Sequence, residues 1–167
     1  KDIKFSNGDP VTAEDFKWSI ERAANPDTGS MNAEVYLGDI LGVKEVIESG
    51  GEINEVVGLK VIDKKTLEIT IDEPKTYFLA KLTYPTAFVL NKNYVEQQGE
   101  SWIDSPVGTG PFILSEYQIG QTLKLKKNDN YWGQKAKVDG IIMNLAGGVS
   151  MAMYENDEID ITGVGLA

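Results

Sequence analysis

The sequence predicts an α+β fold, and three observations support that prediction. Residues 3–22 read as a short strand, a dense turn and a capped helix in succession. Apolar and polar residues alternate from Leu67 to Asp72, as in a half-buried strand. Helices and strands otherwise mix without a regular βαβ rhythm, which favours α+β over a doubly wound sheet.

The first helix is expected to begin just after a turn. Ile3 and Phe5 alternate with polar residues and predict one short strand, and residues 6–10 are all turn formers. Thr12 is then expected to be the N-cap of the helix, with its hydroxyl accepting the backbone N–H of Asp15. Asp15 stands where a capping box has Glu or Gln, so an imperfect box is expected.

The same helix carries an apolar face. Val11 and Phe16 occupy the positions of a hydrophobic staple. Phe16, Ile20 and Ala23 fall on one face at helical spacing. These local signals agree with one another, but they indicate structure and not chemistry.

The middle of the chain predicts short elements separated by turns. A loop of turn formers at residues 25–30 leads to a weaker helix over 33–41. Residues 47–55 are polar and contain two adjacent glycines, so an exposed excursion is expected. Two strands, 59–62 and 67–71, follow, and Pro74 ends the second because proline cannot donate to a ladder.

The second half predicts a further series of short elements. We expect a helix at 78–82, an apolar run at 87–90 that crosses between lobes, and a helix turn at 93–99. A hairpin of 112–117 with 122–126 and a strand at 141–145 should follow. The chain should then form a helix at 151–155, capped by Ser150, and a closing strand at 159–162. A dense turn cluster at 105–111 precedes the hairpin, but it has the spacing of neither a phosphate loop nor a dinucleotide fingerprint.

Composition excludes several classes of function. The net charge of −10 argues against nucleic acid, and no apolar run approaches the roughly 18 residues of a membrane span. No signal peptide is visible, since the first residues lead straight into a strand. The chain has no Cys and no His, which excludes disulfides, thiolate or His-ligated metals and His-based triads.

Five stretches resemble one known family. Residues 5–22 closely resemble a segment of the family 5 extracytoplasmic solute-binding proteins, the oligopeptide- and dipeptide-binding proteins of bacterial ATP-binding-cassette (ABC) importers. In the family's order, 67–74 is similar to its strand ending in Glu-Pro, 106–112 to its Gly-Thr-Gly-Pro turn, 128–133 to its Asn-x-x-Tyr-Trp segment, and 158–161 to its Gly-Glu-Ile-Asp element. Asp157 departs from the family by replacing that element's glycine.

The resemblance implies an internal fragment of a periplasmic-binding-protein-like type II fold, because family members run to about three times this length. Residues 1–91 would form the C-terminal portion of the small extra domain. Residues 92–167 would form the middle portion of the first main lobe. Both domains would be incomplete.

The function implied by the resemblance is non-enzymatic. The parent protein would be a monomeric receptor outside the cell membrane, in the periplasm or lipid-anchored, that captures peptides for the membrane subunits of an ABC permease. No cofactor is implied. Ser30, Met31 and Asn32 align near a region that can face the ligand cleft, and Asn32 departs from the tyrosine common there. Thr109 and Gly110 are expected near the crossing between lobes.

Three alternatives remain open at this point. The same fold could carry nickel complexes, haem or oligosaccharide, although the lack of His argues against direct metal ligation. A carboxylate hydrolase would need two acids across a cleft, and Glu158 with Asp160 comes closest to such a pair. An interaction module would use the acidic surface itself to contact a partner.

Overall fold

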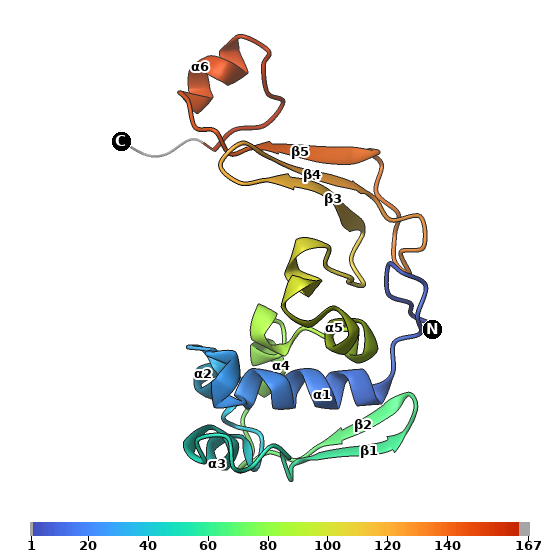
Figure 1. Ribbon diagram of the computed structural model, residues 1–167, viewed down its shortest axis with the longest axis vertical. Helices are drawn as coiled ribbons and strands as arrows, with labels where there is room; N and C mark the ends of the chain where they lie inside the picture. The colour runs from blue at the N-terminus through green and yellow to red at the C-terminus, as the bar shows by residue number, and fades with distance from the viewer. Residues whose placement is uncertain (1, 164–167) are drawn as a thin grey trace.

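The computed structural model describes residues 2–163, which form two regions stacked along the long axis of the molecule (Figure 1). We call residues 2–104 the helical region and residues 105–163 the sheet region. The fold is a mixed α+β arrangement, as expected, and every strand pair among the described residues is antiparallel. Residue 1 and residues 164–167, the outer ends of the two expected domains, lie outside the described residues.

Helix α1, Ala13–Ala24, begins as the sequence predicts but with a complete capping box. The Thr12 hydroxyl accepts the Asp15 N–H at 3.3 Å, and the Asp15 carboxylate accepts the Thr12 N–H at 2.9 Å. The expectation of an imperfect box is therefore wrong, because the shorter Asp side chain still reaches the backbone of the cap. Ile20 belongs to the buried core cluster, whereas Phe16 is 39% exposed and does not.

The strand expected around Ile3 and Phe5 is not formed. The chain makes only an isolated bridge between Lys4 and Pro10. The Phe5 N–H donates to the Asp9 carbonyl at 2.8 Å, and Gly8 turns the chain with a φ of +96°. The run of turn formers reverses the chain directly after the fully buried Phe5, so no ladder can extend from it.

The helix expected over 33–41 ends early, at Leu37, and a second helix that the sequence did not predict follows it. After the 3-10 turn η1, Pro26–Thr28, helix α2 covers Ala33–Leu37 and helix α3 covers Val43–Glu48. Gly42, with a φ of +92°, separates α2 from α3. Helix α3 also corrects the expectation of an exposed excursion from residue 47, since that excursion begins only after Glu48.

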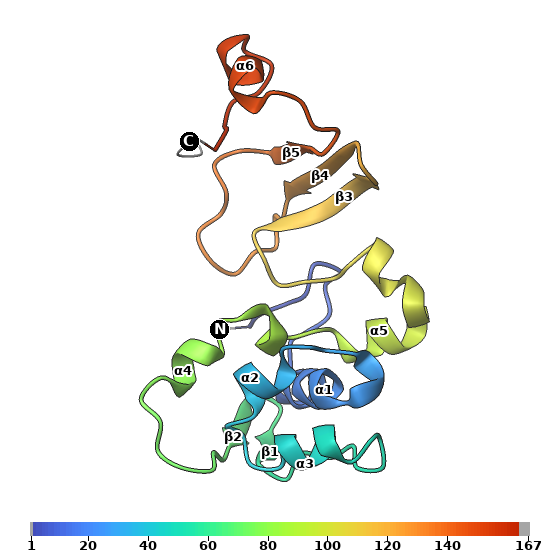
Figure 2. The same ribbon diagram turned by 90° about the vertical axis from the view of Figure 1, so that its left-hand side faces the viewer.

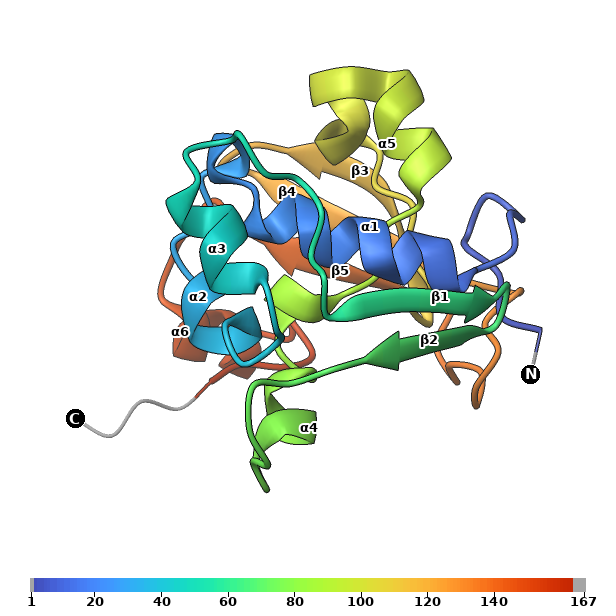
Figure 3. The same cartoon turned by 90° about the horizontal axis from the view of Figure 1, so that it is seen from below.

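The antiparallel pair of β1, Leu59–Asp63, and β2, Thr66–Ile69, runs alongside α1 (Figure 3). Leu67, Ile69 and Ile71 pack against the core, while the residues between them are exposed. This confirms the alternation expected from Leu67 to Asp72. The strand ends at Ile69, earlier than the expected end before Pro74, and Ile71 makes only an isolated bridge to Ile40.

The hydrophobic core lies within the helical region. Its buried cluster is drawn from α1, α2, α3, β1, helix α4, Phe78–Lys81, the 3-10 turn η2, Pro85–Ala87, and the loops between them. The cluster consists of Ile20, Ala24, Leu37, Ile40, Val43, Val46, Val56, Leu59, Phe78 and Ala87. Helix α5, Lys92–Gln98, and the 3-10 turn η3, Gly99–Asp104, complete this region, as seen in Figure 2.

The sheet region is a three-stranded sheet of order β3-β4-β5 with one short helix. Strands β3, Phe112–Gln118, β4, Thr122–Lys127, and β5, Gly140–Asn144, confirm the expected hairpin and strand. Helix α6, Ser150–Glu155, includes Ser150 as its first residue, so Ser150 is not the cap. Among residues 105–163 only Asn128 is buried.

The closing strand expected at 159–162 is absent. These residues have no strand partner among the described residues, and Ile161 is 86% exposed. Alternating hydrophobicity predicts a strand only where a neighbour supplies the ladder, and here none does. In residues 2–163 no helix has the length and apolar character needed to cross a membrane.

Candidate functional site

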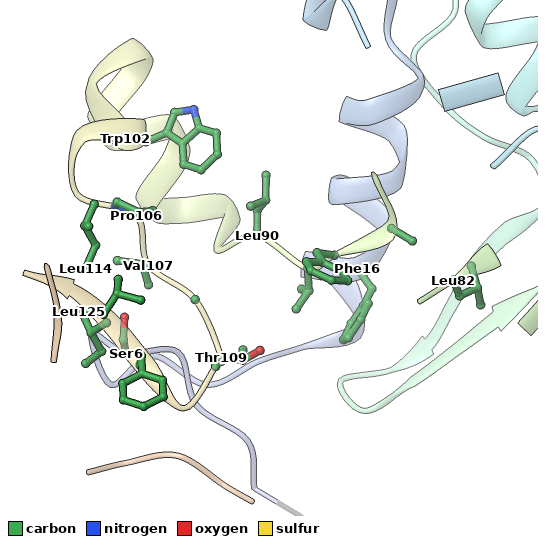
Figure 4. A pocket seen from close by; sticks show the side chains of 17 residues that line it. Ser6, Phe16, Leu82, Leu90, Trp102, Pro106, Val107, Thr109, Leu114 and Leu125 are labelled. Atoms are coloured by element: carbon green, nitrogen blue, oxygen red, sulfur yellow. The ribbon is translucent and has the colours of Figure 1, made fainter. Parts of the chain in front are cut away.

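A hollow of about 650 Å³ opens where the two regions meet (Figure 4). Helix α1 and the segment after η2 line it from the helical region, and the 106–110 loop with β3 and β4 lines it from the sheet region. No lining residue carries a charge. They are Ser6, Phe16, Leu82, Ala87, Phe88, Val89, Leu90, Trp102, Pro106, Val107, Gly108, Thr109, Gly110, Phe112, Ile113, Leu114 and Leu125.

The register of the sheet explains why its apolar face turns to the hollow. Leu114 is paired with Leu125, which is paired in turn with Ile141, so all three side chains share one face. Glu116 and Lys124 lie on the opposite face, where their ion pair spans 2.7 Å. Phe16 and Trp102 stand across the hollow from this sheet face (Figure 4).

The 106–111 turn is fixed by hydrogen bonds to its backbone. The Ser6 N–H donates to the Gly108 carbonyl at 2.8 Å. The buried Asn128 side chain donates to the Gly110 carbonyl at 2.8 Å, and its own N–H donates to the Pro111 carbonyl at 2.9 Å. Thr109 and Gly110, two of the expected site residues, are therefore half-buried in the wall of the hollow.

The other expected site residues lie elsewhere. Ser30, Met31 and Asn32 form an exposed loop before α2, where Met31 is 94% exposed. Asn32 precedes α2 without a side-chain cap bond. These three residues do not line the hollow, so the structure does not bring them together with Thr109 and Gly110.

Sequence reasoning missed an ion-pair cluster that holds the segment before α4. The buried Asp39 lies 2.9 Å from the Lys75 ammonium and 2.6 Å from that of Lys81, and Lys75 also contacts Asp72 at 2.8 Å. Burial alone would raise the pKa of Asp39, but the hydrogen bonds and charges of both lysines outweigh it and hold the pKa below its usual value. Hydrogen bonds to Asp39 and Asp72 raise the pKa of Lys75.

This cluster is structural. Asp39 pairs through its backbone as well, since its carbonyl accepts the Asp72 N–H at 3.0 Å. Asp39 lies more than thirty residues from both of its lysine partners, so no local pattern could have indicated the cluster. Glu73 also lies 3.8 Å from the Lys75 ammonium, so every charge of the cluster is engaged in an ion pair with another member.

The acidic residues near the end of the described chain lie beside α6 and not on a strand. A hollow of about 440 Å³ beside α6 is lined by Tyr154, Glu155, Asp157, Ile159 and Asp160. Because no strand forms there, Glu158 and Asp160 are not held on one strand face. Within residues 2–163 no group of three or more potential acidic ligands is placed to hold a metal.

Comparison with known proteins shows the family to which the chain belongs. Residues 1–167 all match the middle segment of the bacterial extracellular solute-binding proteins, family 5. The chain belongs to this family, which confirms the resemblance inferred from its motifs.

Individual relatives agree with that assignment. The periplasmic oligopeptide-binding protein OppA of Escherichia coli is 33% identical over 97% of this chain and 31% of its own length. The dipeptide-binding protein DppE of Bacillus subtilis is 31% identical over 96% of this chain and 30% of its own length. The structure of Listeria monocytogenes OppA bound to peptide has a TM-score of 0.85 and 30% identity, covering 95% of this chain and 32% of that chain. This chain thus spans about a third of the length of relatives that are binding proteins and not enzymes.

Proposed function

We propose that the protein carrying these residues is the substrate-binding component of an ABC importer, which captures peptides outside the cell membrane and delivers them to the permease. The observation that carries the proposal is the match, over 95% of this chain, to a relative whose structure contains bound peptide. An extended peptide can be held through its main chain, while hydrated pockets accept different side chains. Closure of lobes around the ligand would then signal to the permease.

Within that protein, we assign residues 1–91 to the small extra domain and residues 92–167 to the first main lobe. Two features support this division. The buried cluster is confined to residues 20–87, and position 91 is the N-cap of α5, where the chain leaves that cluster. The sheet region then contributes a separate layer with its own hydrogen-bond ladder.

We further propose that the loop of Ser30, Met31 and Asn32 faces the peptide and that Thr109 and Gly110 shape the crossing between lobes. The loop is exposed, and Asn32 makes no side-chain cap bond, so its amide is available to a ligand. Thr109 and Gly110 belong to a turn whose conformation is set by Ser6 and Asn128, which suits a structural role at the crossing.

The experiment is calorimetric titration of the longer parent protein and of the 167-residue chain with a mixed peptide library. We expect the parent to bind with a Kd of about 1 μM or tighter and the chain alone to bind too weakly to measure. Asn32→Ala in the parent should weaken peptide binding, whereas Glu34→Ala, an exposed neighbour on α2, should not. A parent that ignores peptides but binds nickel complexes, haem or oligosaccharide would overturn the peptide assignment and leave the family intact.

A further inference from the structure

The point where the chain leaves the helical core is held by an unusual set of side chains. Three successive residues, Leu90, Asn91 and Lys92, each bond to a polar side chain from residues 9–19. The Leu90 N–H donates to the Ser19 hydroxyl at 2.8 Å, and the Lys92 N–H donates to the Asp15 carboxylate at 3.2 Å. The Asn91 amide donates to the Asp9 carboxylate at 2.8 Å. We call Asp9, Asp15, Ser19 and Asn91 the crossing latch.

Most of the latch is buried and each member has a second bond. Asp15 is 8%, Ser19 4% and Asn91 3% exposed. Asp15 completes the capping box of α1, and Ser19 donates to the Asp15 carbonyl at 2.6 Å. Asn91 caps α5 by accepting the Tyr94 N–H at 3.0 Å. The latch thus joins the start of α1 to the start of α5, and removing one partner would leave buried polar groups unsatisfied.

The latch reaches the sheet region through α5. The Tyr94 hydroxyl donates to the Ser105 carbonyl at 2.7 Å, at the first residue of the sheet region. Beyond that point the sheet region is tied to the helical region by the bond from Ser6 to Gly108. Between these bonds lies the uncharged hollow, which is lined by apolar residues of both regions.

We infer that the crossing latch is a positioning device: it sets the orientation of the sheet region relative to α1, a role that packing across the hollow does not fill. Ser19 and Asp15 act on the sheet region through Leu90, Lys92 and α5 and not by touching it. Loosening the latch would let the sheet region tilt within the room that the hollow leaves, while the core of the helical region stays folded.

The test uses the absence of Cys, which allows clean spin labelling. Labels on Glu68→Cys in β2 and Gln118→Cys in β3, both exposed, report the distance between the regions by double electron–electron resonance. The test variant is Ser19→Ala. The matched control is Ser49→Ala, because the Ser49 hydroxyl also donates to a helix carbonyl, at 2.8 Å, and accepts a loop N–H, at 3.1 Å, but entirely within the helical region.

We expect Ser19→Ala to widen the distance distribution about twofold and Ser49→Ala to leave it unchanged, with native circular dichroism in both. An unchanged width in Ser19→Ala, or equal broadening in both variants, overturns the inference. Should Ser19→Ala fail to fold, Asp9→Ala removes the exposed member of the latch and must broaden the distribution in its place. An unchanged width in that variant likewise overturns the inference.

Discussion

The helical region and the sheet region are stabilised by different kinds of interaction. All buried apolar residues among the described positions lie between Phe5 and Val95, in the helical region. The sheet region keeps its shape through an antiparallel ladder, with one register shift between Leu114 and Glu116, and through the buried Asn128, while its apolar face borders the hollow. The comparison teaches that a regular hydrogen-bond ladder and a packed core need not coincide in one part of a chain.

The largest expected difference comes from matched leucines. Leu37→Ala removes a fully buried side chain, and we expect it to lower the free energy of unfolding by about 3 kcal/mol. Leu123→Ala in β4 removes a half-buried one and should cost less than about 1 kcal/mol. Urea unfolding followed by circular dichroism measures both. Equal losses would contradict the division into one packed region and one open sheet.

Breaking an ion pair should also cost more unfolding free energy in the helical region than in the sheet region, but the difference should be smaller than for the leucines. Asp39→Asn removes the negative charge of a buried carboxylate that contacts Lys75 and Lys81. We expect it to lower the free energy of unfolding by about 2 kcal/mol. Glu116→Gln breaks the more exposed pair with Lys124, and the loss should stay near about 0.5 kcal/mol. A greater loss from Glu116→Gln in the same urea series would refute this ranking.

The pKa of Asp39 predicts how stability depends on pH. Because this pKa is lower in the folded chain than its ordinary value of 3.8, the contribution of Asp39 is complete above that value and is lost as the pH falls through the folded pKa. Unfolding midpoints measured between about pH 2 and pH 6 should therefore fall more steeply in the natural chain than in Asp39→Asn. Parallel curves would show that Asp39 contributes no proton-linked stability.

The smallest expected effect lies at the end of α6. Asp157 has a φ of +58°, and the N–H groups of Asp157 and Glu158 close the helix on the carbonyls of Tyr154 and Met153. This arrangement favours glycine, so Asp157→Gly should stabilise α6 by about 0.5 to 1 kcal/mol, measured by hydrogen exchange of its amides. Asn156→Gly, at a φ of −92°, should bring no gain. Equal gains would mean that backbone strain at Asp157 is not the cause.

Sequence reasoning succeeded where the signals were local. The Thr12 cap, the β1–β2 pair and the β3–β4 hairpin follow from turn chemistry and alternation within about ten residues. The residues of the five stretches that resemble known motifs also identified the family. No pattern predicted α3, because a helix of six residues is too short to show a helical period of apolar residues.

The features that could not be predicted from the sequence depend on partners far away in the chain. The strand expected at 159–162 has no neighbouring strand within residues 2–163, and Phe16 lies outside the core because its end of α1 borders the hollow. Asp39 and Ser19 find partners more than thirty and seventy residues away. Such pairs depend on the tertiary fold and carry no signature in the local sequence.

Native-state hydrogen exchange of the 167-residue chain tests the central comparison most directly. We expect the amides of α1, β1 and β2 to exchange only through global unfolding, and those of β3, β4 and β5 to exchange through a smaller opening with a lower free energy. One common free energy for all five elements would contradict the account, because it would show that the sheet region shares the stability of the core.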